Sequence, residues 1–406
     1  MLNSCCIHPI ENPKFTIPKS RLRIALCMEY PLKQWGGVEV LVKELLAGLS
    51  PGTDILLASD DTPESLSESR HAEFVTSHFR WDPSRSYPAQ ARDLSAWLLG
   101  SGADLVHFHL GGTYAFQTRS WAQSPIPIVA TSGIPCISTN HGAFSLFDFC
   151  GPQRSLAERL LMLPIFWAGR AKTLLALRRE VTVSDNDLGN MRRWFFPLVR
   201  KFQRIYHSQL SGDEGFYAER EKSIVCLGTV GPRKGQPFLV EAFASLAARF
   251  PDWKLVIAGR LNSGADEVRK MESIISRENL HARIVLAGPV TPEEANRLIL
   301  TCGIFAMPSL AEGLGLSLQE ALFSGCPAVA SRVGGIQDMV VDGKTGWLAE
   351  AGNPTDLARA LAEAMESESV RKARGAAARE RIIALGMNRH EMVSEHLRLY
   401  AEITNR

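Results

Sequence analysis

Residues 303–322 of the chain read GIFAMPSLAEGLGLSLQEAL. An apolar run at 303–308 is followed by a glycine-rich turn and then by a helical pattern, and Glu312 and Glu320 lie eight residues apart. A buried strand that leads through a tight turn into a helix is the unit of parallel α/β sheets. The stretch therefore predicts an α/β fold in which polar groups gather where a strand ends.

The same unit recurs along both halves of the chain. Strand candidates in the first half are 21–27, 53–59, 72–77, 103–109, 135–140 and 180–184, with a helix at 37–49. Those in the second half are 223–228, 254–259, 283–288, 303–308 and 327–331, with helices at 237–250 and 354–365. Strands that are apolar throughout indicate parallel sheets covered on both faces, with ligands beyond the C-terminal edge. We predict two Rossmann-like α/β domains.

The 406 residues suffice for two domains of about 200 residues each. We expect a flexible extension at 1–20, a first domain at 21–207, and a second domain at 208–387 that begins within a polar linker near 206–222. A last helix, at 388–406, is expected to pack back on the first domain.

The composition is that of an ordinary soluble protein, with 45% hydrophobic and 22% charged residues. A net charge of +2 gives no reason to expect nucleic acid. The eight cysteines form no CxxC pair, which favours a reducing compartment without a zinc site. The start, MLNSCCIHPIENPKF, lacks the features of a secretory signal, so we expect a cytoplasmic protein.

Residues 150–205 are strongly basic, with eleven Lys and Arg against four Asp and Glu. Their apolar run Leu160–Gly169 is too short to span a bilayer. Peripheral contact with the inner face of a membrane and an amphipathic core helix both fit this pattern, and the sequence leaves the two open.

We expect a phosphate-binding site at the turn that follows residues 303–308. The free amides of Gly313, Leu314 and Gly315 would form a helix N-terminus, which attracts phosphate. Glu312 before the helix and Glu320 on its second turn could accept hydrogen bonds from sugar and ribose hydroxyls. A helix with ordinary polar faces is the alternative.

Two further turns follow strands. Arg233 and Lys234, in the PRKG turn at 232–235, could neutralise charge on a leaving diphosphate, or could be a solvated turn. Gly36 and Gly37 open the first helix, with Glu39 beside them, and would let the backbone approach a ligand closely.

Histidines and aspartates also follow strands. His141 lies beside Asn140 and Gly142 at a strand end and could donate to a substrate, or be structural. We expect His107 and His109 in the core. Asp185 and Asp187 could hold a divalent metal, but Ser184 and Asp185 also form a good helix N-cap, which we favour.

With these residues in view, the chain resembles the retaining glycosyltransferases of family 4, also called glycosyl transferases group 1. The resemblance covers about residues 21–400, and over 223–350 the segments LGTVGPRKGQPFLVEAF, MPSLAEGLGLSLQEAL and GCPAVASRVGGIQDMV follow the family's order. It implies the GT-B fold, in which two Rossmann-like domains face each other across a cleft. The chain departs from the family at Thr229, where many relatives have arginine, and at IYHSQL before the linker.

The resemblance also implies roles for single residues. Glu312 matches the glutamate that contacts the donor sugar, and Glu320 matches the one that holds the ribose. The family's basic pair, glycine loop and His-Gly motif correspond to Arg233 with Lys234, Gly36 with Gly37, and His141. Such enzymes need no bound metal, so no cofactor is expected beside the nucleotide sugar.

We therefore expect a retaining enzyme that moves a hexose from a UDP- or GDP-sugar to a hydroxyl of a glycan or lipid-linked acceptor, in cell-surface polysaccharide synthesis. The catalytic set would be Glu312, His141, Arg233 and Lys234. A sugar-nucleotide epimerase and a non-catalytic nucleotide-sugar-binding subunit of a synthase are the alternatives.

Overall fold

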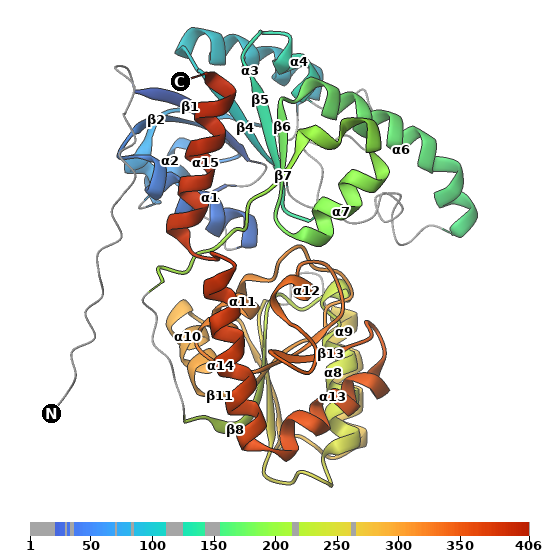
Figure 1. Cartoon of the computed structure of the whole chain (residues 1–406). Coiled ribbons are helices and arrows are strands. Elements are labelled where there is room, and N and C mark those ends of the chain that lie inside the picture. Colours follow the sequence, from blue (N-terminus) through green and yellow to red (C-terminus); the bar gives the residue numbers. More distant parts are fainter. Residues whose placement is uncertain are drawn as a thin grey trace, which may run out of the picture.

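The computed structural model describes residues 21–28, 31–32, 36–69, 71–82, 85–110, 125–142, 155–212, 219–260 and 265–405. They form two α/β domains, each built around one central sheet (Figure 1). The expected extension at 1–20 lies outside the described residues, as do residues 213–218 of the expected linker.

The first sheet has seven strands in the order β3-β2-β1-β4-β5-β6-β7, and every pair is parallel. Its strands are β1 (Leu22–Met28), β2 (Thr53–Ser59), β3 (Val75–Arg80), β4 (Leu105–Leu110), β5 (Cys136–Asn140), β6 (Arg179–Thr182) and β7 (Phe202–Arg204). Its helices are α1 (Gly37–Leu49), α2 (Pro63–Ser67), α3 (Tyr87–Ser101), α4 (Ile126–Ala130), α6 (Leu156–Ala176) and α7 (Asp185–Trp194), with 3₁₀ turns at Ala72–Phe74 and Phe196–Lys201.

The second sheet has six parallel strands in the order β10-β9-β8-β11-β12-β13. Its strands are β8 (Glu221–Leu227), β9 (Lys254–Ala258), β10 (Ile284–Gly288), β11 (Cys302–Met307), β12 (Ala328–Ser331) and β13 (Gly346–Ala349). The helices are α8 (Gln236–Leu246), α9 (Ala265–Arg277), α10 (Pro292–Thr301), α11 (Leu316–Phe323), α12 (Ile336–Met339), α13 (Pro354–Glu366), α14 (Glu368–Ala384) and α15 (Arg389–Thr404), with a 3₁₀ turn at Pro232–Lys234. The predicted fold class is thus confirmed.

The structure differs from the predicted elements in several places. The strand expected at 72–77 begins at Val75, because residues 72–74 form a 3₁₀ turn and the polar SHFR segment continues the strand. The sequence analysis also missed the edge strands β7 and β13, which have three and four residues. Such short runs carry too few side chains to show a period.

Both faces of the first sheet are buried, as its apolar strands require. In β1, Ile24 and Leu26 belong to one apolar cluster, whereas Ala25 and Cys27 belong to another. Successive side chains of a strand point to opposite faces, so one strand supplies both layers of the core.

The last helix, α15, belongs to the core of the first domain although it follows the second domain in sequence. It contacts α1 and β4 and runs along the first sheet (Figure 1). Met392, Leu399 and Tyr400 are buried in the same cluster as β1. The Arg389 side chain also pairs with Glu44 of α1 at 2.9 Å.

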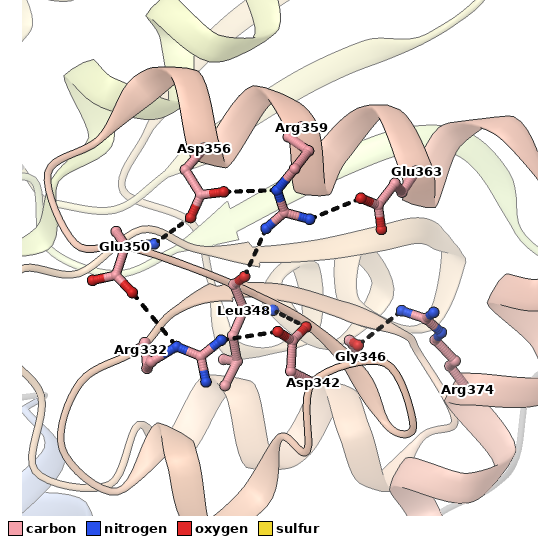
Figure 2. A network of polar contacts seen from close by, with 9 residues as sticks. All are labelled: Arg332, Asp342, Gly346, Leu348, Glu350, Asp356, Arg359, Glu363 and Arg374. Carbon is pink, nitrogen blue, oxygen red and sulfur yellow. Dashed lines mark hydrogen bonds and ion pairs between the residues drawn. The ribbon is translucent and has the colours of Figure 1, made fainter.

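The free edge of β13 is closed by side chains (Figure 2). The Leu348 amide donates to Asp342, and its carbonyl accepts from Arg359, which also pairs with Asp356 and Glu363. In the same network, Arg374 donates to the carbonyl of Gly346. An edge strand whose polar groups are occupied offers no template for pairing with another chain.

Candidate donor-binding site

The turn between β11 and α11 holds most of the predicted site. Gly315, with φ of +87°, caps the N-terminus of α11, which begins at Leu316 rather than near Leu314 as expected. A left-handed residue is cheapest as glycine. Gly313 and Leu314 are buried beside it, and Glu312 is half-buried. The structure thus brings all four predicted residues of this turn to one helix N-terminus.

Glu312 and Lys234 form a close ion pair in this turn. The Lys234 Nζ lies 2.5 Å from Glu312 Oε2, and the Ser309 hydroxyl donates to the same oxygen at 3.3 Å. Burial opposes ionisation of Glu312, but the charges of Lys234 and Arg233 outweigh it and lower the pKa of its carboxyl below the ordinary value. The site therefore holds an ionised carboxylate and an ammonium group in contact.

The basic turn is fixed to the Glu312 turn by backbone as well. The Leu310 amide donates to the carbonyl of Arg233 at 2.7 Å. Arg233 itself is exposed, so its guanidinium lies at the surface beside the buried pair. The structure therefore brings the PRKG turn against the turn that carries Glu312.

Glu320 occupies the second turn of α11, as predicted. Its Oε1 accepts a hydrogen bond from Gln209 Nε2, a side chain of the segment that joins the two domains. Sequence reasoning missed Gln209, because no pattern in the IYHSQL segment indicates a partner 111 residues away.

The first domain contributes Gly36, Gly37 and Glu39 at the start of α1. A Cβ on Gly37 would lie 3.9 Å from Leu316 Cδ1, so the two helix N-termini approach each other across the domains. Glu39 is buried, and burial raises the pKa of its carboxyl, partly offset by backbone hydrogen bonds and the charges of Lys43 and Arg260. Arg260 follows β9, so a positive charge of the second domain acts on the Glu39 carboxylate of the first.

His141 meets the donor turn directly. A Cβ added to Gly313 would lie 2.2 Å from the carbonyl oxygen of His141, a distance that only glycine avoids. His141 is half-buried at the end of β5, and its Nε2 lies 3.2 Å from His109 Nδ1. The predicted His141 and the glutamate turn are therefore neighbours in space.

Behind His141 lies a closed group that sequence reasoning did not find. We call it the histidine ring, and its members are His107, His109, His141, His207 and His396. Successive ring centroids lie between 4.2 and 5.6 Å apart. The members come from β4, the end of β5, the connection between domains, and α15. The one sequence signal for this group is the i, i+2 spacing of His107 and His109, which places both on the same face of a strand.

Asp185 and Asp187 lie in the first turn of α7. The Ser184 hydroxyl caps α7 by accepting from the Asp187 amide at 3.1 Å, as we favoured. Asp185 pairs with Arg204 at 2.8 Å, and its amide donates to Asp338 of the second domain at 2.6 Å. Among the residues that the structure describes, no group of His, Cys, Asp or Glu side chains is arranged to hold a metal ion.

This arrangement suits an anionic ligand that also carries hydroxyl groups. The ammonium of Lys234, the guanidinium of Arg233 and the N-terminus of α11 offer positive charge. The carboxylates of Glu312 and Glu320 offer acceptors for hydroxyls, and the carbonyl of His141 in the first domain lies against Gly313 next to Glu312.

Comparison with known proteins agrees with this geometry. The sequence model of the glycosyl transferases group 1 matches residues 213–381, and that of glycosyltransferase family 4 matches residues 35–207. The chain belongs to glycosyltransferase family 4. The two matches cover the two domains separately, and the candidate site draws on both.

Curated relatives match part of this chain. An uncharacterized glycosyltransferase of Methanocaldococcus jannaschii is 32% identical over 149 residues, which are 37% of this chain and 40% of that protein. The D-inositol 3-phosphate glycosyltransferase of Corynebacterium urealyticum is 32% identical over 153 residues, 37% of this chain and 36% of the relative. The chain thus spans about two fifths of the length of these relatives.

Solved structures share the whole fold. Sucrose-phosphate synthase from Thermosynechococcus elongatus has a TM-score of 0.74 at 19% identity, over 94% of this chain and 99% of the other. Anabaena HepE, in complex with UDP and glucose, has a TM-score of 0.71 at 16% identity, over 94% and 100%. At such identities the likeness supports the GT-B fold alone.

Proposed function

We propose that this protein is a retaining glycosyltransferase that moves a hexose from a UDP- or GDP-sugar to a hydroxyl of a glycan or lipid-linked acceptor. The observation that carries the proposal is the Lys234–Glu312 pair at the N-terminus of α11, in a chain of family 4. Anabaena HepE, of the same fold, is seen with UDP and glucose. A relative in Mycolicibacterium smegmatis is named as a GDP-mannose-dependent mannosyltransferase.

In the proposed reaction the bond from the sugar's anomeric carbon to the diphosphate breaks, and a bond to the acceptor oxygen forms on the same face. Lys234, Arg233 and the amides of α11 stabilise the negative charge that develops on the leaving diphosphate. Glu312 and Glu320 hold hydroxyls of the sugar and ribose, and His141 holds the sugar from the opposite domain. Front-face attack assisted by the leaving phosphate fits, because Glu312 is engaged by Lys234.

We extend the proposal to the acceptor side through α6. Among the described helices, none combines the length and apolarity needed to cross a bilayer. The outer face of α6 exposes Leu156, Leu160, Leu161 and Ile165 at helical spacing. Basic side chains on an adjoining helix make contact with an anionic lipid surface reasonable, which suits a lipid-linked acceptor.

The first test is calorimetric titration of the purified protein with UDP, GDP and ADP, each in EDTA and then with magnesium. Tight binding of one nucleotide in EDTA supports a metal-independent transferase and names the donor class. Binding that requires magnesium contradicts the metal-free proposal.

The matching nucleotide sugar is then incubated with and without acceptors. Conversion of the free nucleotide sugar without acceptor would instead identify an epimerase, and binding without transfer or hydrolysis would identify a non-catalytic subunit.

A further inference from the structure

His109 is within hydrogen-bonding distance of the ring of His141. Its Nδ1 lies 3.2 Å from His141 Nε2, and the two rings are 5.4 Å apart between centroids. His109 is fully buried in β4, whereas His141 is half-buried beside the donor turn. The contact thus joins a fixed core residue to a residue that we place against the donor sugar.

The pair shares one proton between two facing nitrogens. Burial and the neighbouring histidines lower the pKa values of both rings well below the ordinary value, so both are neutral at neutral pH. A neutral imidazole carries one N–H and one lone pair. Either His109 donates from Nδ1, which leaves the N–H of His141 on Nδ1, or His141 donates from Nε2, which leaves its Nδ1 as an acceptor.

The surroundings of His109 select the first arrangement. Its Nε2 is buried and has no hydrogen-bond partner among the residues that the structure describes. In the first arrangement His109 Nε2 carries a lone pair that accepts no hydrogen bond. In the second it carries an N–H that donates none, and buried N–H groups without an acceptor are rarer in protein interiors than acceptors without a donor.

We propose that His109 is a positioning residue that donates from Nδ1 to His141 and thereby presents the Nδ1–H of His141 to the sugar of the bound donor. This inference rests on the proposed function and adds to it a fixed tautomer at the donor sugar. His107 packs against His109 from the core side, with ring centroids 4.2 Å apart and ring planes tilted by 35°.

The tautomer is measured first, on the full-length protein labelled with ¹⁵N-histidine. In a long-range ¹H–¹⁵N spectrum, His141 should show a protonated Nδ1 and an unprotonated Nε2 in the wild type. A protonated Nε2 on His141 overturns the proposal, whether or not the protein shows transferase activity.

Two variants separate positioning from packing. H109F keeps an aromatic ring without a donor, and H109N places an amide N–H near the position of Nδ1. We expect H109F to change the tautomer balance of His141 and to lower kcat about tenfold or more, with KM for the donor changed little. H109N should retain the His141 tautomer and recover kcat to within about threefold.

H396L is the matched control, because His396 belongs to the same buried ring but makes no hydrogen bond with His141. It should lower stability and leave the His141 tautomer as in the wild type. Equal kcat in H109F and wild type, or equal loss in H109F and H109N, overturns the proposal. If the wild type has the expected tautomer but transfers no sugar, the proposed function fails and the His109–His141 pairing stands.

Discussion

Lys234 is the residue whose loss should affect turnover most. Its ammonium contacts Glu312 at 2.5 Å, and K234A would remove this charge from the diphosphate and leave a half-buried carboxylate without its partner. We expect kcat to fall by a factor on the order of 100 to 1,000, as for other groups that stabilise developing charge. Steady-state transfer of the donor named by calorimetry measures this.

The control for this variant is K222A in the same domain. Lys222 forms an ion pair with Asp252 at 2.9 Å, but both side chains are well exposed, so the pair contributes little. Its activity should stay near that of the wild type. Turnover of K234A within about threefold of wild type would contradict the role we give to Lys234.

Gly313 allows the two domains to meet at the site. An added methyl group would lie 2.2 Å from the carbonyl oxygen of His141, so G313A must move the donor turn away from the first domain. Because small displacements of reacting groups are costly, we expect kcat/KM to fall about tenfold or more. G100A is the matched control, since Gly100 lies in α3 with open space around it. Similar activity in both variants would argue against this contact.

Among elements, α15 should stabilise the first domain strongly. Leu399 on this helix is 1% exposed and packs in the core with β1, whereas Leu397 on the same helix is 36% exposed. L399A should lower the free energy of unfolding by about 2 to 5 kcal/mol, and L397A by less than about 1 kcal/mol. Urea denaturation compares the two, and equal effects would show that α15 is not part of this core.

The surface of α6 can be tested as a membrane contact. Leu161 is 76% exposed, and Trp167 of the same helix donates to the carbonyl of Trp194, which places the exposed Arg192 and Arg193 nearby. We expect L161D to lose about tenfold in sedimentation with anionic vesicles relative to wild type.

L99D is the comparison for this surface, because Leu99 is also exposed, at 56%, but lies on α3. It should bind vesicles as the wild type does. Equal binding by wild type and L161D, or by anionic and uncharged vesicles, would count against an anionic lipid partner.

The elements that the sequence predicted well are those with strong local patterns. The helix Gly37–Leu49 and the strand Thr53–Ser59 have the predicted bounds, because a glycine marks where each begins: Gly36 precedes the helix and Gly52 precedes the strand. In contrast, β7 and β13 are edge strands whose pairing is decided by their neighbours. The turn with Glu312 could be placed next to Lys234 because parallel strands end at one edge.

At the scale of the whole molecule, the histidine ring should make stability depend on pH. Burial lowers the pKa values of His107, His109, His141 and His207 well below the ordinary value and that of His396 to about 4. The unfolded chain therefore binds more protons than the folded chain once the pH falls below about 6.5. Stability should be full above that pH and fall toward pH 4, by up to about 1.4 kcal/mol per pH unit for each histidine.

Urea denaturation between pH 5 and 8 tests this dependence. Within the described residues, the histidines act on one another, and the Met392 carbonyl accepts from His396 Nδ1 at 2.8 Å, which partly offsets the effect of burial on His396. Tyr400 and Thr139 complete the contacts of His107, and none of these partners is a carboxylate. In H396L the free energy of unfolding should fall less steeply as the pH is lowered, by the slope that corresponds to about one bound proton. A flat profile from pH 7 to pH 5 would contradict neutral, buried histidines.

The histidine ring also marks where sequence reasoning stops. His109 and His141 each follow or lie in a predicted strand, but His207 and His396 lie in the connection and in the last helix. Their meeting depends on how the domains and α15 fold together. No local period or motif carries that information. The positions of Glu312 and Lys234 could therefore be predicted from the sequence, whereas the packing of the histidine ring behind His141 could not.

The placement of α15 has a consequence for how the protein is made. The ribosome delivers β1 well before Tyr400, yet both belong to one core. At ordinary elongation rates roughly 20 to 80 seconds separate them. Throughout that interval the nascent first domain lacks the helix that covers one face of its sheet, so its leucine-rich surface is open to chaperones. Synthesis and folding are thereby coupled: the domain that emerges first matures last.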